Sequence, residues 1–227
     1  DGNTNILDKG ICWSINPHPT IAESYSSSGS GVGNYTSNLT NLLPNTTYFV
    51  RAYLTNEVGT VYGNEISFVT APLSIGSFYQ GGIVFHIFQP GDAGYVAGET
   101  HGLIAAPYDQ PNATWGCYGT MMNTSNILGS GLQNTINILG ACTEPGIAAR
   151  ICDNLVVNGY SDWYLPSLTE LSLLFTNRNQ VGGFSANFYW SSSEINHYSA
   201  YELYFYDGYL YSNIKYGSAL VRAVRTF

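Results

Sequence analysis

The stretch YWSSSEINHYSAYELYFYDGYLYSNIKY, residues 189–216, decides how the C-terminal part of this chain folds. Asp207-Gly208 lies between two runs of alternating residues, which predicts a β-hairpin with a two-residue type I′ turn. This turn would oppose Tyr204 to Tyr211. Side chains alternate between the two faces of a strand. One predicted face, able to cover a core, carries Leu203, Phe205, Leu210 and Ile214; the other carries Glu202, Tyr204, Tyr206, Tyr209, Tyr211 and Asn213.

The tyrosines on the second face have two explanations. Tyrosine has a high β-propensity, and aromatic pairs across strands stabilise a sheet by up to about 1 kcal/mol each. Tyrosine is also enriched in binding sites, because it offers a large, fairly rigid contact area and a hydroxyl group. Residues 195–199 read as a loop at the edge of the same surface. This loop favours recognition over plain sheet packing.

The composition indicates a β-rich protein with a polar but weakly charged surface. Only 10% of the 227 residues are charged, and the net charge is −8. This acidity disfavours nucleic acid and strongly sulfated glycans, because basic residues dominate the binding of such polyanions. No apolar run is long enough to span a membrane. We expect a piece trimmed from a longer extracellular or cell-surface protein, either monomeric or tethered to further surface domains.

Four motifs mark residues 1–71: GICWS (10–14), NPHPT (16–20), LLPNTTYFVRAY (42–53) and VYGNEISFVT (61–70). Together they resemble the fibronectin type III-like repeats of bacterial surface proteins. The resemblance implies a small all-β, immunoglobulin-like sandwich that serves as a spacer, with Tyr48 in a tyrosine corner. We count about five strands, residues 34–42 among them, whereas such a sandwich has about seven. We therefore expect this domain to be partial.

Residues 72–78 form a predicted linker, and a second set of motifs follows: GGIVFHI (81–87), HGLIAAPYDQ (101–110), WGCYGT (115–120), GYSDWYLPSLTEL (159–171), FYWSSSE (188–194) and VRAVR (221–225). In this order they closely resemble the bacterial "major paralogous" family, a C-type-lectin-like module found in adhesins. For residues 79–227 the resemblance implies an α+β fold with two helices, a twisted antiparallel sheet and adjacent chain ends. It also implies a ligand face on the last strands and their loops.

The residues of this second part predict several of its elements. Pro145 is placed to start a helix whose apolar spacing continues to Leu155. Ser167, with Glu170 three residues later, predicts a second helix that begins with a capping box. Residues 115–142, rich in Gly, Asn and Thr, are expected to be irregular, and residues 219–225 are expected to form one last strand.

The C-terminal region also resembles the variable repeat of proteins diversified by retroelements, which use the same lectin-like fold and are encoded by bacteria or phages. In such systems, mutation of template adenines converts Asn codons to Tyr, Ser, His, Ile and other residues. The segment between FYWSSSE and VRAVR is rich in these residues. We take them as the candidate ligand-binding residues: Ile195, His197, Tyr198, Ser199, Tyr201, Tyr204, Tyr206, Tyr209, Tyr211, Ser212, Ile214 and Tyr216.

Metal and cofactor sites receive little support from the sequence. The histidines, His18, His86, His101 and His197, lack the spacing of metal ligands. The calcium-dependent sugar site of true lectins resembles EPN or QPD followed by WND, and neither motif is present. We therefore expect no cofactor and no metal.

The cysteines are too few for a scaffold built on disulfides. Cys117 and Cys142 bracket the irregular segment, and we predict that they form a disulfide, which would stabilise the fold by roughly 3–4 kcal/mol. We expect Cys12 and Cys152 to be buried thiols.

We expect a surface-displayed, non-enzymatic binding protein of the adhesin or receptor type, whose ligand is a protein or a glycan. One alternative is a carbohydrate-active enzyme, which needs two suitably spaced carboxylates. Asp162 and Glu194 are weak candidates, and we expect each to accept backbone or Trp N–H hydrogen bonds instead. The other alternative is a structural component of the cell surface without a dedicated ligand.

Overall fold

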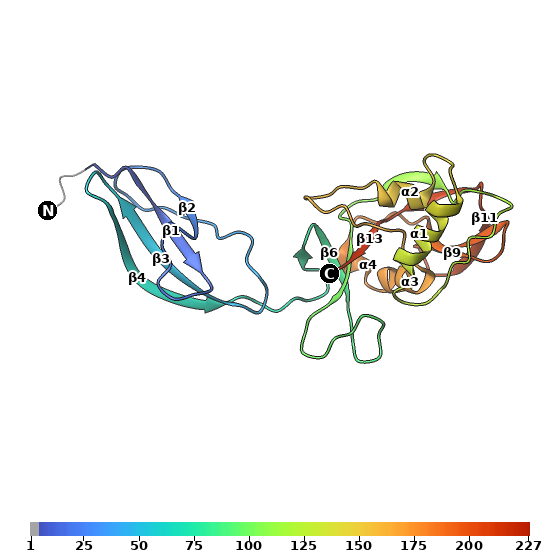
Figure 1. Cartoon of the computed structure of the whole chain (residues 1–227), viewed down its shortest axis with the longest axis horizontal. Helices are drawn as coiled ribbons and strands as arrows, with labels where there is room; N and C mark the ends of the chain where they lie inside the picture. Colours follow the sequence, from blue (N-terminus) through green and yellow to red (C-terminus); the bar gives the residue numbers. More distant parts are fainter. Residues whose placement is uncertain (1–4) are drawn as a thin grey trace. The chain divides into compact units, whose positions relative to one another are not determined.

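The computed structural model describes residues 5–227, which divide into two compact units. The first unit extends to Leu73 and the second begins at Ser74 (Figure 1). Part of the predicted linker therefore belongs to the second unit, where the Gly76 N–H donates to the Val84 carbonyl at 2.8 Å. No helix among the described residues is long and apolar enough to cross a membrane.

The first unit is built on one antiparallel sheet in the order β2-β1-β3-β4. Its strands are β1 (Asp8–Ser14), β2 (Ser24–Ser27), β3 (Thr47–Thr55) and β4 (Thr60–Val69). Trp13, Tyr48 and Val50 form a small buried cluster. The Tyr48 hydroxyl accepts a hydrogen bond from the Leu43 N–H at 3.0 Å, the contact expected of a tyrosine corner.

The strand expected at residues 34–42 is wrong, because this segment is a loop. Leu39 and Leu42 pack against the small cluster from positions three residues apart, which is not the alternation of a strand. Asn41 has a φ of 57°, in the left-handed region, and this also interrupts extended backbone.

The second unit contains two sheets, with strand orders β11-β10-β9-β12-β8 and β13-β7-β6-β5. Its strands are β5 (Phe78–Tyr79), β6 (Gly82–Ile87), β7 (Gly102–Ala105), β8 (Gln110–Thr114), β9 (Phe188–Glu194), β10 (Ser199–Tyr204), β11 (Leu210–Ile214), β12 (Ser218–Val221) and β13 (Val224–Thr226). The β12–β9 pair is parallel, so the sheet is not wholly antiparallel as expected. The two ends of the unit meet, since the rings of Tyr79 and Phe227 lie 5.3 Å apart.

The single last strand expected at residues 219–225 is in fact two strands in different sheets. β12 ends at Val221, and β13 begins at Val224 beside β7. Arg222 lies between them, and its buried guanidinium binds Asp109 and the Gly183 carbonyl. These contacts hold the chain where it passes from one sheet to the other.

The described residues form four helices instead of the expected two: α1 (Gly131–Ala141), α2 (Ala148–Asp153), α3 (Leu168–Thr176) and α4 (Arg178–Val181). α1 lies within the segment expected to be irregular. Its buried face consists of Gly131, Asn134, Thr135 and Ile138, whose helical spacing is hidden because most of them are not apolar. Pro145 precedes α2 in a turn and does not start the helix.

The capping box predicted for α3 is confirmed. The Ser167 hydroxyl accepts from the Glu170 N–H, and the Glu170 carboxylate accepts from the Ser167 N–H at 2.8 Å. Leu171 and Leu174 on this helix pack into the main core of the second unit. That core also holds Tyr189 and Leu203, so it fixes the inner face of β9 and β10.

Candidate ligand-binding surface

The hairpin at the end of the chain has a different register from the predicted one. Leu203 pairs with Leu210 and Glu202 with Tyr211, a shift of two residues. The connection is the four-residue loop 205–208, closed by the Tyr204 N–H donating to the Tyr209 carbonyl at 3.0 Å. An even shift leaves each side chain on its predicted face.

The position of Phe205 explains this register. Its ring is buried among aromatic rings of the core, 4.3 Å from Tyr189 and 4.9 Å from Phe184. The pairing with β11 therefore ends after Tyr204, while the Phe205 N–H still donates to the Asn187 carbonyl at 2.9 Å on the β9 side. In the loop that follows, Gly208 has a positive φ of 82° and Asp207 does not, whereas a type I′ turn needs both.

None of the candidate binding residues is buried. Among the candidate tyrosines, Tyr206 and Tyr209 are the most exposed, at 70% and 68%. Five of the residues that lie between the candidates are buried instead: Ala200, Glu202, Leu203, Phe205 and Lys215. The segment thus separates into an inner set that holds the fold and an outer set that faces solvent.

The prediction that Leu210 and Ile214 cover a core is wrong, since both side chains are exposed. β11 is the edge strand of its sheet, beyond the reach of the core that buries Leu203 on β10. Both faces of β11 therefore belong to the surface. Glu202, predicted on the tyrosine face, is only 5% exposed, and burial raises its pKa. The Asn213 amide donates to its carboxylate at 3.2 Å.

One aromatic cluster, which we call the hairpin patch, lies at the loop end of β10 and β11. Tyr204 stacks on Phe188 with ring centroids 4.5 Å apart, and Tyr211 meets Phe188 edge-on at 5.2 Å. Tyr206 lies 6.0 Å from Tyr204. Phe188 was not among the candidates. It is paired with Tyr204 across β9 and β10, so the two side chains lie on the same face of the sheet.

A second cluster, which we call the loop patch, lies at the other end of the same strands. Tyr118 is 5.0 Å from both Tyr198 and Tyr216, and His197 contacts Tyr198 at 4.0 Å between ring centroids. Sequence reasoning missed Tyr118, which lies far from the hairpin along the chain. The one feature of the sequence that could have drawn attention to Tyr118 is its position directly after Cys117, a residue of the predicted disulfide.

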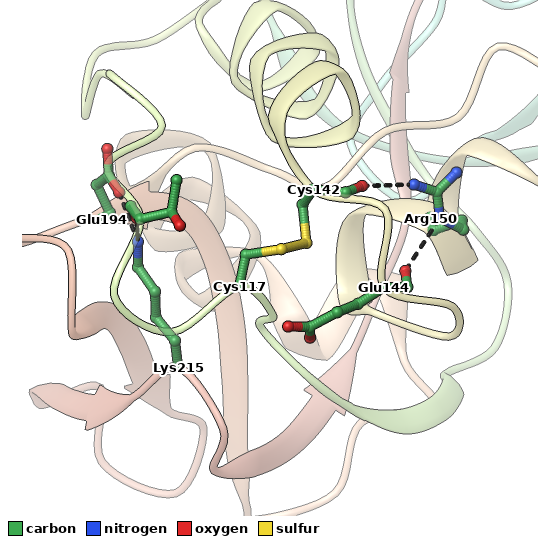
Figure 2. The surroundings of a disulfide bond; sticks show 7 residues. Cys117, Cys142, Glu144, Arg150, Glu194 and Lys215 are labelled. Carbon is green, nitrogen blue, oxygen red and sulfur yellow. Dashed lines mark hydrogen bonds and ion pairs between the residues drawn. A yellow bond between two sulfur atoms is a disulfide. The ribbon is translucent and has the colours of Figure 1, made fainter.

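A buried ion pair joins Lys215, the residue before Tyr216 of the loop patch, to Glu194, and Figure 2 shows the two side chains. The Lys215 ammonium and the Glu194 carboxylate are 2.7 Å apart, with side chains 0% and 2% exposed. Lys215 also donates to the Thr120 carbonyl and lies over the Trp115 ring, while Glu194 accepts from the Met122 N–H at 2.8 Å. The prediction for Glu194 is confirmed, because its carboxylate receives backbone N–H hydrogen bonds.

Cys117 and Cys142 are joined by a disulfide (Figure 2). Cys12 and Cys152 are buried free thiols. Within residues 5–227, Cys117, Cys142 and Glu144 are the one group of potential metal ligands close enough to share an ion. Both sulfurs are consumed by the disulfide, so this group does not fit a metal.

The remaining candidates for chemistry have ordinary structural partners. Asp162 forms a bidentate ion pair with Arg225, which lowers the pKa of Asp162, so its main partner is Arg225 and not the expected backbone or Trp N–H group. His86 contacts Asp92 at 2.9 Å. His101 contacts Glu99 at 2.8 Å, and this hydrogen bond raises the pKa of His101.

Comparison with known protein families finds a similarity within the second unit. Residues 113–225 match the family model of the Lcl C-terminal domain, a span that runs from β8 to β13 and includes both aromatic patches. No curated protein matches the chain. The matched family and the mixed architecture, mostly strands with few helices, are consistent with a C-type-lectin-like fold.

Proposed function

From the similarity of residues 113–225 to the Lcl C-terminal domain, we propose that the chain is a surface-displayed ligand-binding protein of the adhesin or receptor type. Its second unit binds a protein or a glycan through the C-terminal face that carries the hairpin patch and the loop patch. The first unit serves as a fibronectin type III-like spacer. The protein works outside the cell and is not an enzyme.

The observation that carries this proposal is the division of residues 195–216 into a buried frame and an exposed outer set. The outer set is dominated by tyrosine, and several tyrosines pack against one another in defined positions. Rings held in this way lose little conformational freedom on binding. They suit either class of ligand, because tyrosine anchors protein pockets and stacks on sugar rings.

The two carboxylates considered for catalysis support a non-enzymatic function. Glu194 is buried in its ion pair with Lys215, and Asp162 is held by Arg225. General acid and base catalysis needs a carboxylate that can reach the substrate and change its protonation state. Glu194 is too deeply buried to reach a substrate, and the carboxylate of Asp162, although its side chain is 57% exposed, is occupied by two nitrogens of Arg225.

The test is replacement of the exposed tyrosines followed by binding measurements on arrays of oligosaccharides and extracellular proteins. We expect Tyr206→Ala/Tyr209→Ala to abolish binding while the thermal transition stays unchanged, because neither side chain is buried. The wider variant, which adds Tyr204→Ala and Tyr211→Ala, should also lose binding. Tyr95→Ala/Tyr108→Ala is the matched control, since these exposed tyrosines lie outside the candidate face. Equal binding by all three variants would refute the proposal.

We further propose that a retroelement diversifies this face. The candidate residues fit products of adenine mutation in Asn codons, and all of them face solvent at least in part, where substitution leaves the frame intact. Deep sequencing of a clonal population tests this proposal. We expect substitutions to cluster in codons 195–218 and to follow adenines of a nearby template copy, and an invariant region would indicate a fixed adhesin.

A further inference from the structure

Tyr118 lies in the loop patch, although it comes from a different part of the chain from the other aromatic residues there. It belongs to the segment between β8 and α1, whereas Tyr198 and Tyr216 flank the β10–β11 hairpin. Its side chain is 49% exposed, so the ring packs on its neighbours and still faces solvent. It therefore extends the exposed aromatic surface beyond the hairpin.

The backbone on each side of Tyr118 is hydrogen-bonded to the two loops that carry its aromatic neighbours. The Gly119 N–H donates to the His197 carbonyl at 2.7 Å, and the Gly116 N–H donates to the Lys215 carbonyl at 3.0 Å. The Lys215 N–H donates in turn to the Tyr198 carbonyl at 2.9 Å. These bonds connect the three segments that carry the aromatic rings of the loop patch.

The disulfide fixes the segment of Tyr118 from the opposite side. Cys117, its immediate neighbour, is joined to Cys142, which is fully buried just after the end of α1 (Figure 2). Gly116 packs closely on Ile147: a Cβ atom added to Gly116 would lie 2.4 Å from the Ile147 side chain. The segment is thus held between the helical side of the unit and the hairpin loops.

We propose that Tyr118 is a constant contact residue of the ligand-binding face, and that the Cys117–Cys142 disulfide is its positioning device. This inference rests on the proposed function. Tyr118 lies outside residues 195–216, so it presents the same ring whatever residues occupy the hairpin positions. The loop patch would then combine a fixed aromatic contact with neighbours that determine specificity.

The first experiment measures amide hydrogen exchange of the whole chain by mass spectrometry, without any ligand. Tyr118→Ala and Cys117→Ser/Cys142→Ser should exchange about tenfold faster than the wild type in peptides covering residues 195–199 and 214–217, because local opening becomes easier. Tyr118→Phe keeps the ring and should match the wild type, as should the control Tyr95→Ala. Unchanged exchange in the disulfide variant would overturn the positioning role.

The second experiment uses the oligosaccharide and extracellular-protein arrays as probes. We expect Tyr118→Ala to bind about tenfold more weakly than the wild type, the loss typical of an aromatic contact at an interface. Tyr95→Ala should bind like the wild type. If Tyr206→Ala/Tyr209→Ala loses binding and Tyr118→Ala does not, the contact role of Tyr118 is refuted while the proposed function stands. If the wild type binds no probe, the proposed function fails, and exchange alone decides whether the disulfide positions Tyr118.

Discussion

At the scale of single residues, the proposed binding face depends on charged groups that are buried below its surface. Lys215 and Glu194 are buried together, and each also bonds to backbone of residues 120–124. A buried charge is tolerated when it is paired and hydrogen-bonded, and becomes costly when its partner is removed. The loops above this pair are therefore fixed by residues that a ligand would not touch.

We expect Glu194→Gln to lower the free energy of unfolding by about 3–5 kcal/mol, because it leaves the Lys215 charge buried without a counterion. Urea denaturation measures this change. The double variant Glu194→Gln/Lys215→Met should recover part of the loss, since it removes both charges. A double variant no more stable than Glu194→Gln would show that the pair is not the source of the effect.

Glu202 provides a prediction about pH. Burial raises its pKa above the ordinary value of 4.5, so the folded state binds the proton more tightly than the unfolded state. The resulting stabilisation is complete below about pH 4.5 and is lost as the pH rises through the folded pKa. Urea denaturation at several pH values should therefore show Glu202→Gln gaining stability relative to the wild type as the pH rises.

Asp162 is the control for that experiment, because its pKa is shifted in the opposite direction from the pKa of Glu202. Its hydrogen bonds with Arg225 lower the pKa of Asp162 in the folded state. The stabilisation is present above the unfolded pKa and is lost as the pH falls through the folded pKa. Asp162→Asn should thus be most destabilising near neutral pH, and parallel pH profiles for the two variants would contradict this account.

At the scale of elements, the β10–β11 hairpin depends on a glycine whose place is set by a neighbouring helix. Gly208 has a φ of 82°, and a Cβ atom there would lie 2.3 Å from the Phe175 ring of α3. The loop thus needs glycine both for its backbone conformation and for close packing. This contact connects the tip of the hairpin patch to the core.

We expect Gly208→Ala to destabilise the protein by about 1–3 kcal/mol more than Gly159→Ala. Gly159 is a matched control because its φ of 84° is similar and no atom lies within 4 Å of the added methyl group. Gly159→Ala should cost only about 1–2 kcal/mol, from the left-handed conformation. Equal losses in urea denaturation would mean that the Phe175 contact contributes nothing.

Elements differed in how well the sequence predicted them. The start of α3 was predictable because Ser167 and Glu170 are close in the chain and their hydrogen bonds are local. α1 was missed because its buried face includes Asn134 and Thr135, whose side chains bond to groups from distant segments. Such partners can be recognised only after those segments have been brought together.

At the scale of the whole molecule, the disulfide connects the aromatic face to the helical side of the second unit. We expect Cys117→Ser/Cys142→Ser to lower the free energy of unfolding of this unit by about 3–4 kcal/mol, because the unfolded chain is no longer constrained. Calorimetry of the wild type and the variant measures the loss. Cys152→Ser, which changes a buried free thiol, controls for substitution of a buried cysteine, and an equal loss there would refute a special role for the bond.

The composition of the proposed binding face could be predicted from the sequence only in part. The alternation of residues 199–214 identified which side chains share a face, and this survived the error in register because the shift was even. The exposure of Leu210 and Ile214 was not predictable, since it depends on β11 being the edge strand. The contribution of Phe188 and Tyr118 likewise depends on contacts between separate segments.

The sequence by itself determined the features that arise between near neighbours: the alternation of the strands, the capping box of α3 and the tyrosine-rich character of the C-terminal segment. The tertiary structure decided the hairpin register, the edge position of β11 and the joining of Tyr118 to Tyr198 and Tyr216. The physical reason is that the core selects which side chains it buries. Because Phe205 and Lys215 are buried, the pairing of β10 with β11 ends next to them and the neighbouring tyrosines are left exposed to solvent.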